Sequence, residues 1–218
     1  MTIDHPIFKQ SIKIIQSRLG YTGLDPLQQQ VLERLIHTTG DFDIQPLLKF
    51  SPSACEIGIS ALQAGAPILT DTAMAAAAVA PMAARTLASE IHCVLDWAPD
   101  KAEEGFTRAG MGMKNAWKEV SHKFLRQKAP LVLIGSAPTA LEVLLDLLSD
   151  GAHFPSLIIA MPVGFVGVLQ SKKRLSFFNC SQIRLDGHRG GAALVAATTN
   201  ALLRASVDPS LVLSKRQN

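Results

Sequence analysis

His37 is the residue of this chain whose type and surroundings best suit acid–base chemistry near neutral pH. It follows an apolar helical stripe of Leu27, Val31 and Leu35, and it precedes Thr38-Thr39-Gly40, where a helix is expected to end. The carbonyl end of a helix favours a protonated imidazole, so a histidine with a partner there can act as an acid. The alternative is that His37 only bonds the last carbonyl groups of its own helix.

Other candidate groups could bind an anion. Arg108 opens a predicted helix, where the helix dipole disfavours a cation, and this hints at an anionic partner although surface arginines are common. Gly190 and Gly191 follow a predicted strand and would let backbone N–H groups approach an anion, which alone is a weak motif. The run 172–174 is expected to be a solvated face, and Ser11 could be an incidental small residue beside an apolar stripe.

The stretch 131–167 organises the elements that must position these groups. Its unbroken apolar runs 131–134 and 157–160 predict strands buried on both faces, and leucines at helical spacing lie between them. The stretch therefore reads as a βαβ unit, with loops at the carboxyl ends of its strands, where open parallel sheets bind ligands. Further strands are predicted at 44–50, 67–71, 91–95 and 181–185, and helices at 8–19, 24–39, 53–64, 73–84, 107–124, 168–176 and 192–203.

Together these elements predict an α/β fold with a single domain over residues 1–218 and a core at about 5–204. We expect a mostly parallel open sheet of about five to six strands with helices on both faces, and a frayed tail after Ala205. Trp117, Val120 and Phe124 should point inward from their helix. Ser53 and Glu56 have capping-box spacing, although Pro52 could instead begin that helix.

Two loops at predicted strand ends leave open questions. Ser136 could accept bonds from the free N–H groups of the helix that Pro138 begins. Asp71 follows a predicted strand and could be either a helix cap or a functional carboxylate.

Composition narrows the classes of function. The 218 residues are 48% hydrophobic and 18% charged with a net charge of +3, which favours a folded core and argues against nucleic-acid binding. The chain lacks the GxGxxG, GxxxxGK[ST] and GxSxG motifs of nucleotide-binding proteins and serine hydrolases. Three scattered cysteines indicate neither a zinc site nor disulfides, so no metal is expected. No signal peptide and no apolar run of about 18 residues are seen, so we expect a cytoplasmic protein without a membrane partner.

Longer motifs carry a resemblance to a known family. They include Ile36-His37-Thr38-Thr39-Gly40, Ala61-Leu62-Gln63-Ala64-Gly65-Ala66-Pro67-Ile68 leading to Asp71, and Gly135-Ser136-Ala137-Pro138-Thr139-Ala140-Leu141. Met161-Pro162-Val163-Gly164-Phe165-Val166-Gly167 with Ser171-Lys172, Thr107-Arg108 and Arg189-Gly190-Gly191 complete them. In this order, over about residues 5–204, the chain resembles the precorrin-8X methylmutase family of cobalamin biosynthesis.

The resemblance implies an isomerase that moves a methyl group from C-11 to C-12 of a corrin precursor, precorrin-8X or cobalt-precorrin-8. The product would be hydrogenobyrinic acid or cobyrinic acid, and no cofactor would be needed. The family's catalytic histidine falls on His37, which would donate a proton to the tetrapyrrole. The positions expected to bind substrate are Ser11, Thr107, Arg108, Gly135, Ala137, Thr139, Gly164, Lys172, Arg189, Gly190 and Gly191.

The chain departs from the family pattern at several polar positions. Ser136 replaces the usual Asn, and Ala80, Ala109 and Ala192 stand where hydroxyl-bearing residues are usual. These losses favour an alternative from another class: a diverged paralogue that binds or carries corrinoid intermediates without isomerising them. A nucleotide-binding α/β domain is a more distant alternative.

The family resemblance also implies a homodimer with the active site at or near the subunit boundary. Residues 73–84 are rich in Ala and Met, and they would leave an apolar surface on an isolated monomer. A second copy would cover that surface in a two-fold assembly.

Overall fold

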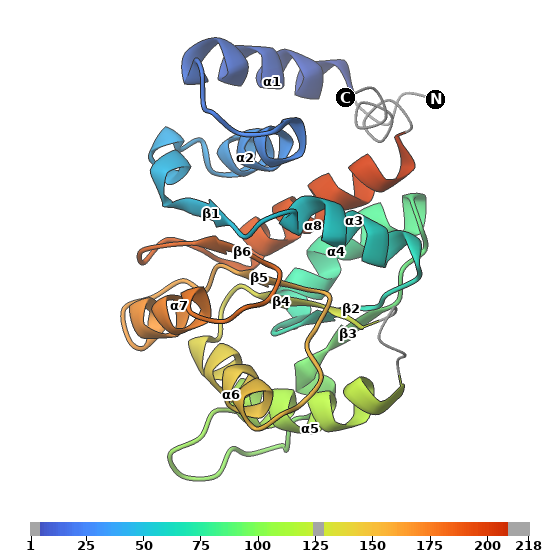
Figure 1. Cartoon of the computed structure of the whole chain (residues 1–218), viewed down its shortest axis with the longest axis vertical. Helices are drawn as coiled ribbons and strands as arrows, with labels where there is room; N and C mark the ends of the chain where they lie inside the picture. The colour runs from blue at the N-terminus through green and yellow to red at the C-terminus, as the bar shows by residue number, and fades with distance from the viewer. Residues whose placement is uncertain (1–4, 124–128, 209–218) are drawn as a thin grey trace.

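The computed structural model describes residues 5–123 and 129–208, and they form one α/β domain (Figure 1). The helices are α1 (Pro6–Leu19), α2 (Pro26–Thr39), α3 (Ala54–Gln63), α4 (Ala73–Arg85), α5 (Arg108–Lys123), α6 (Pro138–Ser149), α7 (Val168–Ser176) and α8 (Ala192–Val207). Two 3-10 helices, η1 (Phe42–Leu47) and η2 (Val94–Trp97), lie between longer elements. The strands are β1 (Leu48–Phe50), β2 (Ile68–Thr70), β3 (Ile91–Cys93), β4 (Leu131–Ile134), β5 (Leu157–Ala160) and β6 (Gln182–Leu185).

The six strands form one sheet in the order β1-β6-β5-β4-β2-β3. All neighbouring pairs are parallel except β1 and β6, which pair antiparallel with Leu48 opposite Leu185. The parallel strands β2, β4, β5 and β6 end at one edge, and the loops after them carry half of the predicted site residues. The predicted fold class, a mostly parallel sheet with helices on both faces, is confirmed.

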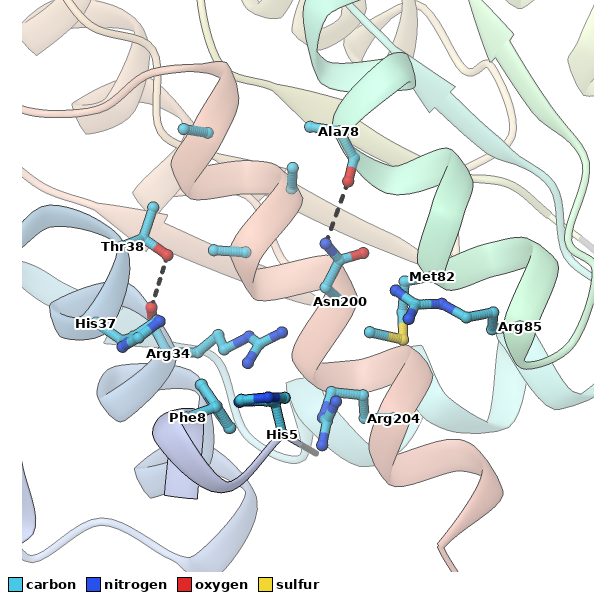
Figure 2. Close-up of a pocket in the computed structure, with 13 residues that line it drawn as sticks. His5, Phe8, Arg34, His37, Thr38, Ala78, Met82, Arg85, Asn200 and Arg204 are labelled. Atoms are coloured by element: carbon cyan, nitrogen blue, oxygen red, sulfur yellow. Dashed lines mark hydrogen bonds between the residues drawn. The ribbon is translucent and has the colours of Figure 1, made fainter. Parts of the chain in front are cut away.

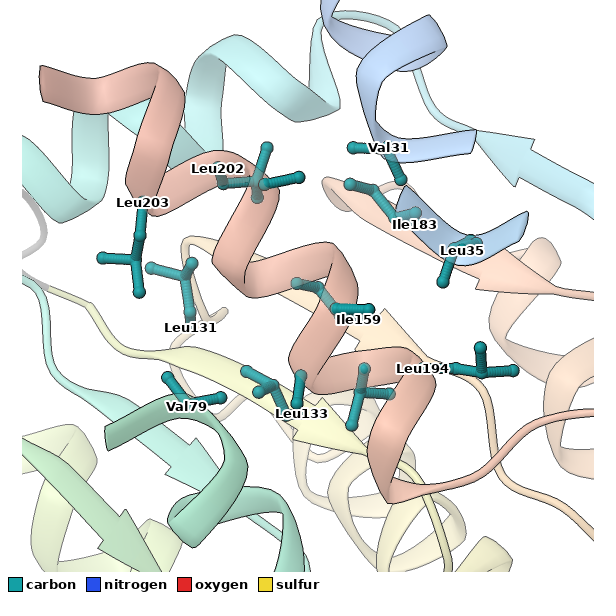
Figure 3. Packing of buried hydrophobic residues seen from close by; sticks show 14 of the residues in the cluster. Val31, Leu35, Val79, Leu131, Leu133, Ile159, Ile183, Leu194, Leu202 and Leu203 are labelled. Atoms are coloured by element: carbon teal, nitrogen blue, oxygen red, sulfur yellow. The ribbon is translucent and has the colours of Figure 1, made fainter. Parts of the chain in front are cut away.

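Two helical layers bury the sheet. One layer contains α1 to α4 and α8, and Figure 3 shows Leu194, Leu202 and Leu203 of α8 among the side chains that cover β4 and β5. The other layer contains η2, α5, α6 and α7, whose Met113, Trp117 and Leu144 pack against the opposite face. Because both faces are covered, all four residues of β4 are fully buried, as the unbroken apolar run predicted.

Several predicted boundaries were wrong, and each error has a local cause. The strand expected at 44–50 is only β1, because Asp41 caps a 3-10 helix by accepting a bond from the Asp43 N–H. The strand expected at 91–95 likewise ends at Cys93, where η2 begins.

The capping predictions were also wrong. Ser53 lies in the left-handed region at φ 55° and makes no side-chain cap bond, so the expected capping box is absent. Ser136 does not cap α6 either, because Ala137 is the N-cap residue and no side chain bonds there.

Towards the end of the chain α8 continues past Leu203 and Ala205 to Val207. Trp117 and Val120 point inward from α5 as predicted. Phe124 and most of the predicted tail lie outside the described residues.

Candidate active site

His37 has a specific partner in the fold. It lies in the last turn of α2, and its Nδ1 atom is 2.8 Å from the Oγ atom of Ser11 on α1. Gly40, in the left-handed conformation, caps α2 through its own N–H group, so His37 is not needed to bond the last carbonyls. No hydrogen bond joins His37 Nε2 to any residue within 5–123 or 129–208. Ser11 can therefore orient the ring while Nε2 remains available to a ligand.

The ring of Phe8 supports this pair from the side. It meets the imidazole of His37 edge-on, with 4.9 Å between the ring centroids. Phe8 and Ser11 lie one helical turn apart on α1, so both reach α2 from the same helix face. The orientation of His37 thus depends on α1 and α2 packing together.

A groove of about 460 Å³, here called the His37 groove, opens beside this histidine (Figure 2). Small side chains of α8 and α4 line it, namely Ala78, Ala193, Ala196 and Ala197. Its lining also includes three arginines, Arg34, Arg85 and Arg204, and the second histidine His5, and no Asp or Glu among the residues that the structure describes. An apolar surface edged by cations suits a flat ligand that carries negative groups.

Gly135 and Ala137, in the loop after β4, were expected to bind substrate, but a carboxylate of the protein accepts the backbone N–H groups of this loop. Oδ2 of Asp71 accepts bonds from the N–H groups of Gly135, Ser136 and Ala137 at 3.0, 2.6 and 2.8 Å. Burial raises the pKa of Asp71 above its ordinary value, and the three donors oppose that shift. Asp71 is thus a buried structural carboxylate that ties the end of β2 to the start of α6.

Gly135 has a second structural role. A Cβ atom at this position would lie 2.8 Å from backbone atoms of Ala192, so only glycine lets this loop approach the start of α8. The close approach of α8 therefore accounts for the glycine, and the Asp71 carboxylate accounts for its N–H group.

Thr107, Arg108 and Thr139 gather in the opposite layer from His37. The hydroxyl groups of Thr107 and Thr139 are 2.6 Å apart, and this contact joins the starts of α5 and α6. The guanidinium Nε of Arg108 donates to the Pro99 carbonyl at 3.0 Å. Within one chain these residues do not line the His37 groove.

The last loop lies near the end of α2. Arg189 forms an ion pair with Asp41 at 3.2 Å and a longer one with Asp43 at 3.8 Å. A Cβ atom on Gly190 would lie 2.0 Å from the Met161 carbonyl oxygen, so a side chain is excluded there. The N–H group of Gly191 donates to the same carbonyl at 2.8 Å. These contacts fix the loop between β5 and the segment that follows His37.

Gly164 belongs to the same loop cluster. Its carbonyl oxygen is 2.7 Å from Nδ1 of His188, and its own N–H group donates to the His188 carbonyl at 3.2 Å. With φ at 136°, Gly164 adopts a conformation that side chains disfavour.

Lys172 was expected on a solvated face, but it is buried, with only 2% of its surface exposed. Its ammonium donates to the carbonyl oxygens of Gly187 and Arg189 at 2.7 and 2.8 Å. Burial lowers its pKa to about 8, although the nearby Asp186 carboxylate partly opposes this. Lys172 therefore holds the last loop from inside the protein, while its neighbour Arg174 pairs with Glu142 and Asp146 on the surface.

The described residues, 5–123 and 129–208, contain no group of three or more His, Cys, Asp or Glu side chains that could hold a metal ion. No helix in this part of the chain is long and apolar enough to cross a membrane. The cysteines Cys55, Cys93 and Cys180 form no disulfide with one another, and burial raises the pKa of Cys180 to about 11.

Comparison with known proteins assigns the family. The sequence model of precorrin-8X methylmutase matches residues 6–205. The chain belongs to the precorrin-8X methylmutase family. It is 34% identical to the cobalt-precorrin-8 methylmutase of Synechocystis over 92% of this chain and 95% of that protein. It is 36% identical to the precorrin-8X methylmutase of Pseudomonas aeruginosa, with 90% and 93% of the two chains covered.

A solved methylmutase structure agrees with this fold. The precorrin-8X methylmutase of Thermus thermophilus superposes with a TM-score of 0.81 at 36% identity, over 93% of this chain and 96% of that one. The family assignment made from the sequence motifs is therefore confirmed.

Sequence reasoning missed several residues of this candidate methylmutase site. Arg34, Arg85 and Arg204 come from three different helices, and no motif joins them. Phe8 begins the predicted helix 8–19, and nothing in its sequence context indicated that it contacts His37. The interpretation of Asp71 stayed open between two roles because its partners lie more than sixty residues away in the chain.

Proposed function

We propose that this protein is the isomerase that converts precorrin-8X, or its cobalt form, by moving a methyl group from C-11 to C-12 of the macrocycle. The product is hydrogenobyrinic or cobyrinic acid, an intermediate of cobalamin biosynthesis. The observation that carries the proposal is the Ser11–His37 pair beside a cationic groove in a chain of this family. The groove suits a flat ring that bears several carboxylates.

His37 supplies the proton in this proposal. In the imidazolium, Nδ1–H donates to Ser11 Oγ and fixes the ring, while Nε2–H faces the ligand. Protonating the conjugated macrocycle favours one tautomer and so eases migration of the methyl group between adjacent carbons. The proton returns to His37 when the product forms, so the reaction is balanced without a cofactor.

The alternative, a carrier of corrinoid intermediates, rests on the missing polar groups at positions 80, 109, 136 and 192. None of these four residues lines the His37 groove. Ala192 is buried against Gly135, and Ser136 belongs to the loop whose N–H groups bond Asp71. Their substitution therefore leaves the groove lining unchanged, and this favours the enzyme over the carrier.

His37→Ala tests the assignment directly. Removing a general acid should lower conversion of the precursor to the orange-red corrin by about 100-fold or more. His153→Ala is the matched control, because His153 is an exposed histidine outside the groove. Unchanged turnover by His37→Ala would defeat the catalytic role. A wild-type protein that binds the product corrin and never converts the precursor would instead establish the carrier.

We also propose that the working unit is a cytoplasmic homodimer whose second copy completes the site. The outer face of α4 supports this, because Met74 is 71% exposed and Ala77, Ala80 and Ala84 are exposed beside it. Arg108 and Thr107 lie in the opposite layer from His37, so a second copy could bring its own pair towards the groove. Light scattering should give about twice the chain mass of 23.4 kDa, and the mass of a single chain would contradict the dimer.

A further inference from the structure

The cations of the His37 groove are not the ones that sequence motifs single out. Within one chain, Arg189 pairs with Asp41, Lys172 donates to two backbone carbonyl oxygens, and Arg108 lies in the other layer. The groove lining instead contains Arg34, Arg85 and Arg204, which come from α2, α4 and α8. Among the described residues no Asp or Glu lines the groove, so the three guanidinium groups give this part of its lining a positive charge.

Phe8 positions two of these arginines. The guanidinium carbon of Arg34 lies 4.4 Å from the centre of the Phe8 ring, and that of Arg204 lies 5.6 Å from it. The same ring contacts His37 edge-on. Stacking on an aromatic face limits the motion of a guanidinium group, so the two cations have preferred positions relative to the imidazole.

Arg85 is oriented by its own helix. Its Nε atom donates to the Pro81 carbonyl at 2.9 Å, and this fixes the plane of the guanidinium. Within the described part of the chain its two terminal nitrogens have no hydrogen-bond partner. A planar fork of this kind matches a carboxylate through two parallel bonds.

The rest of the lining leaves room for a flat ring between these groups. Figure 2 shows His37 at one end of the groove and Arg85 at the other, with Arg34 between them. One side of the groove is lined by three alanines of α8, whose methyl groups project little into it: Ala193, Ala196 and Ala197. A macrocycle against these alanines would place its reacting carbons towards His37 and its peripheral acid side chains towards the arginines.

We propose that Arg34, Arg85 and Arg204 are specificity-determining residues that make the groove selective for macrocycles with free carboxylate side chains over the same macrocycles with amidated ones. The inference rests on the proposed function and adds the residues that recognise the substrate. A neutral amide cannot form the charge-assisted pair of bonds that a carboxylate forms with a guanidinium. The selectivity for carboxylate over amide side chains therefore depends on these three positive charges and not on His37.

The test compares two probes on the full-length protein. One is the product corrin with free acid side chains, and the other is the same corrin with every peripheral carboxyl converted to a primary amide. Arg85→Gln should weaken binding of the acid corrin by roughly 10- to 100-fold and leave binding of the amide corrin nearly unchanged. Arg204→Gln should act in the same direction, and the affinity of the wild type for the acid corrin should fall as salt rises.

Arg18→Gln is the matched control. It removes one positive charge and one arginine–aromatic contact, over Phe42 and away from the groove, and it should leave both affinities unchanged. Equal weakening of the acid and amide corrins by Arg85→Gln and Arg204→Gln would overturn the inference, because it would indicate a packing role. The inference would also be overturned if Arg85→Gln and Arg204→Gln both bound the acid corrin as tightly as the wild type does. Failure of the wild type to bind the acid corrin at all would refute the proposed function and this inference together.

Discussion

Replacement of Lys172 by Met gives a prediction whose size can be worked out from the structure. The lysine is 2% exposed, and its pKa is lowered from 10.5 to about 8 by burial. At about 1.36 kcal/mol for each pKa unit, the burial of the charge costs about 3 kcal/mol. Two hydrogen bonds from a charged donor to Gly187 and Arg189 offset that cost, at about 1.5–3 kcal/mol each.

The sign of the pH dependence follows from the lowered pKa. Below pH 8 Lys172 is charged in the folded and the unfolded chain, so the cost of burying the charge is fully present. Between pH 8 and 10.5 the unfolded chain binds more protons at this position than the folded one. The free energy of unfolding therefore rises with pH in this window, by about 2.5 kcal/mol between pH 7 and pH 10.

The assay is urea unfolding of the wild type and Lys172→Met at several pH values from 7 to 10. Other lysines titrate in both proteins, so the difference between the two isolates Lys172. From pH 7 to pH 10 the free energy of unfolding of the wild type should rise by about 2.5 kcal/mol relative to that of Lys172→Met. Lys173→Met is the control, because Lys173 belongs to the same run but is exposed. A difference that stays constant or moves the other way would refute the argument that Lys172 is buried as described.

Further expectations concern Ser11, Asp71 and α4. Ser11→Ala should lower turnover about 10-fold, because one hydrogen bond that orients His37 is lost. Ser17→Ala, on the same helix, is the control and should leave turnover unchanged. Equal rates for the two variants would contradict the role of Ser11. Asp71→Ala removes the charged acceptor of three backbone N–H groups, one buried and two part-buried, and should lower the free energy of unfolding by about 3–5 kcal/mol. A loss below about 1 kcal/mol in urea unfolding would argue against that network. Ala77→Glu should halve the mass seen by light scattering and keep the far-ultraviolet circular dichroism of the fold, so an intact dimer would place the subunit boundary elsewhere.

The parts of the fold that the sequence predicted well are those set by local patterns. Unbroken apolar runs identified β4 and β5, and Gly20 and Gly40 marked the ends of α1 and α2. The short 3-10 helices η1 and η2 were missed because their residues also suit strands, and the Asp41 cap decides the first of them.

The contacts of the candidate site were less predictable because they join distant segments. His37 was identified from its place at a helix end, but nothing near it in sequence indicates that Ser11, twenty-six residues away, bonds its ring. Lys172 resembled its exposed neighbours, and only the loop at 187–189 folding over it makes it buried. The charge of the groove depends on three arginines spread from position 34 to position 204, so no spacing within a motif could reveal it.

The position of α8 in the chain has a consequence for protein synthesis. Most of its side chains are buried between the sheet and α2, α3 and α4, and every one of these elements precedes it in the chain. During translation the surface that receives α8 therefore stays uncovered until the helix leaves the ribosome. Nascent chains that pause before residue 192 should be the species that chaperones bind, since transiently exposed apolar surface promotes aggregation.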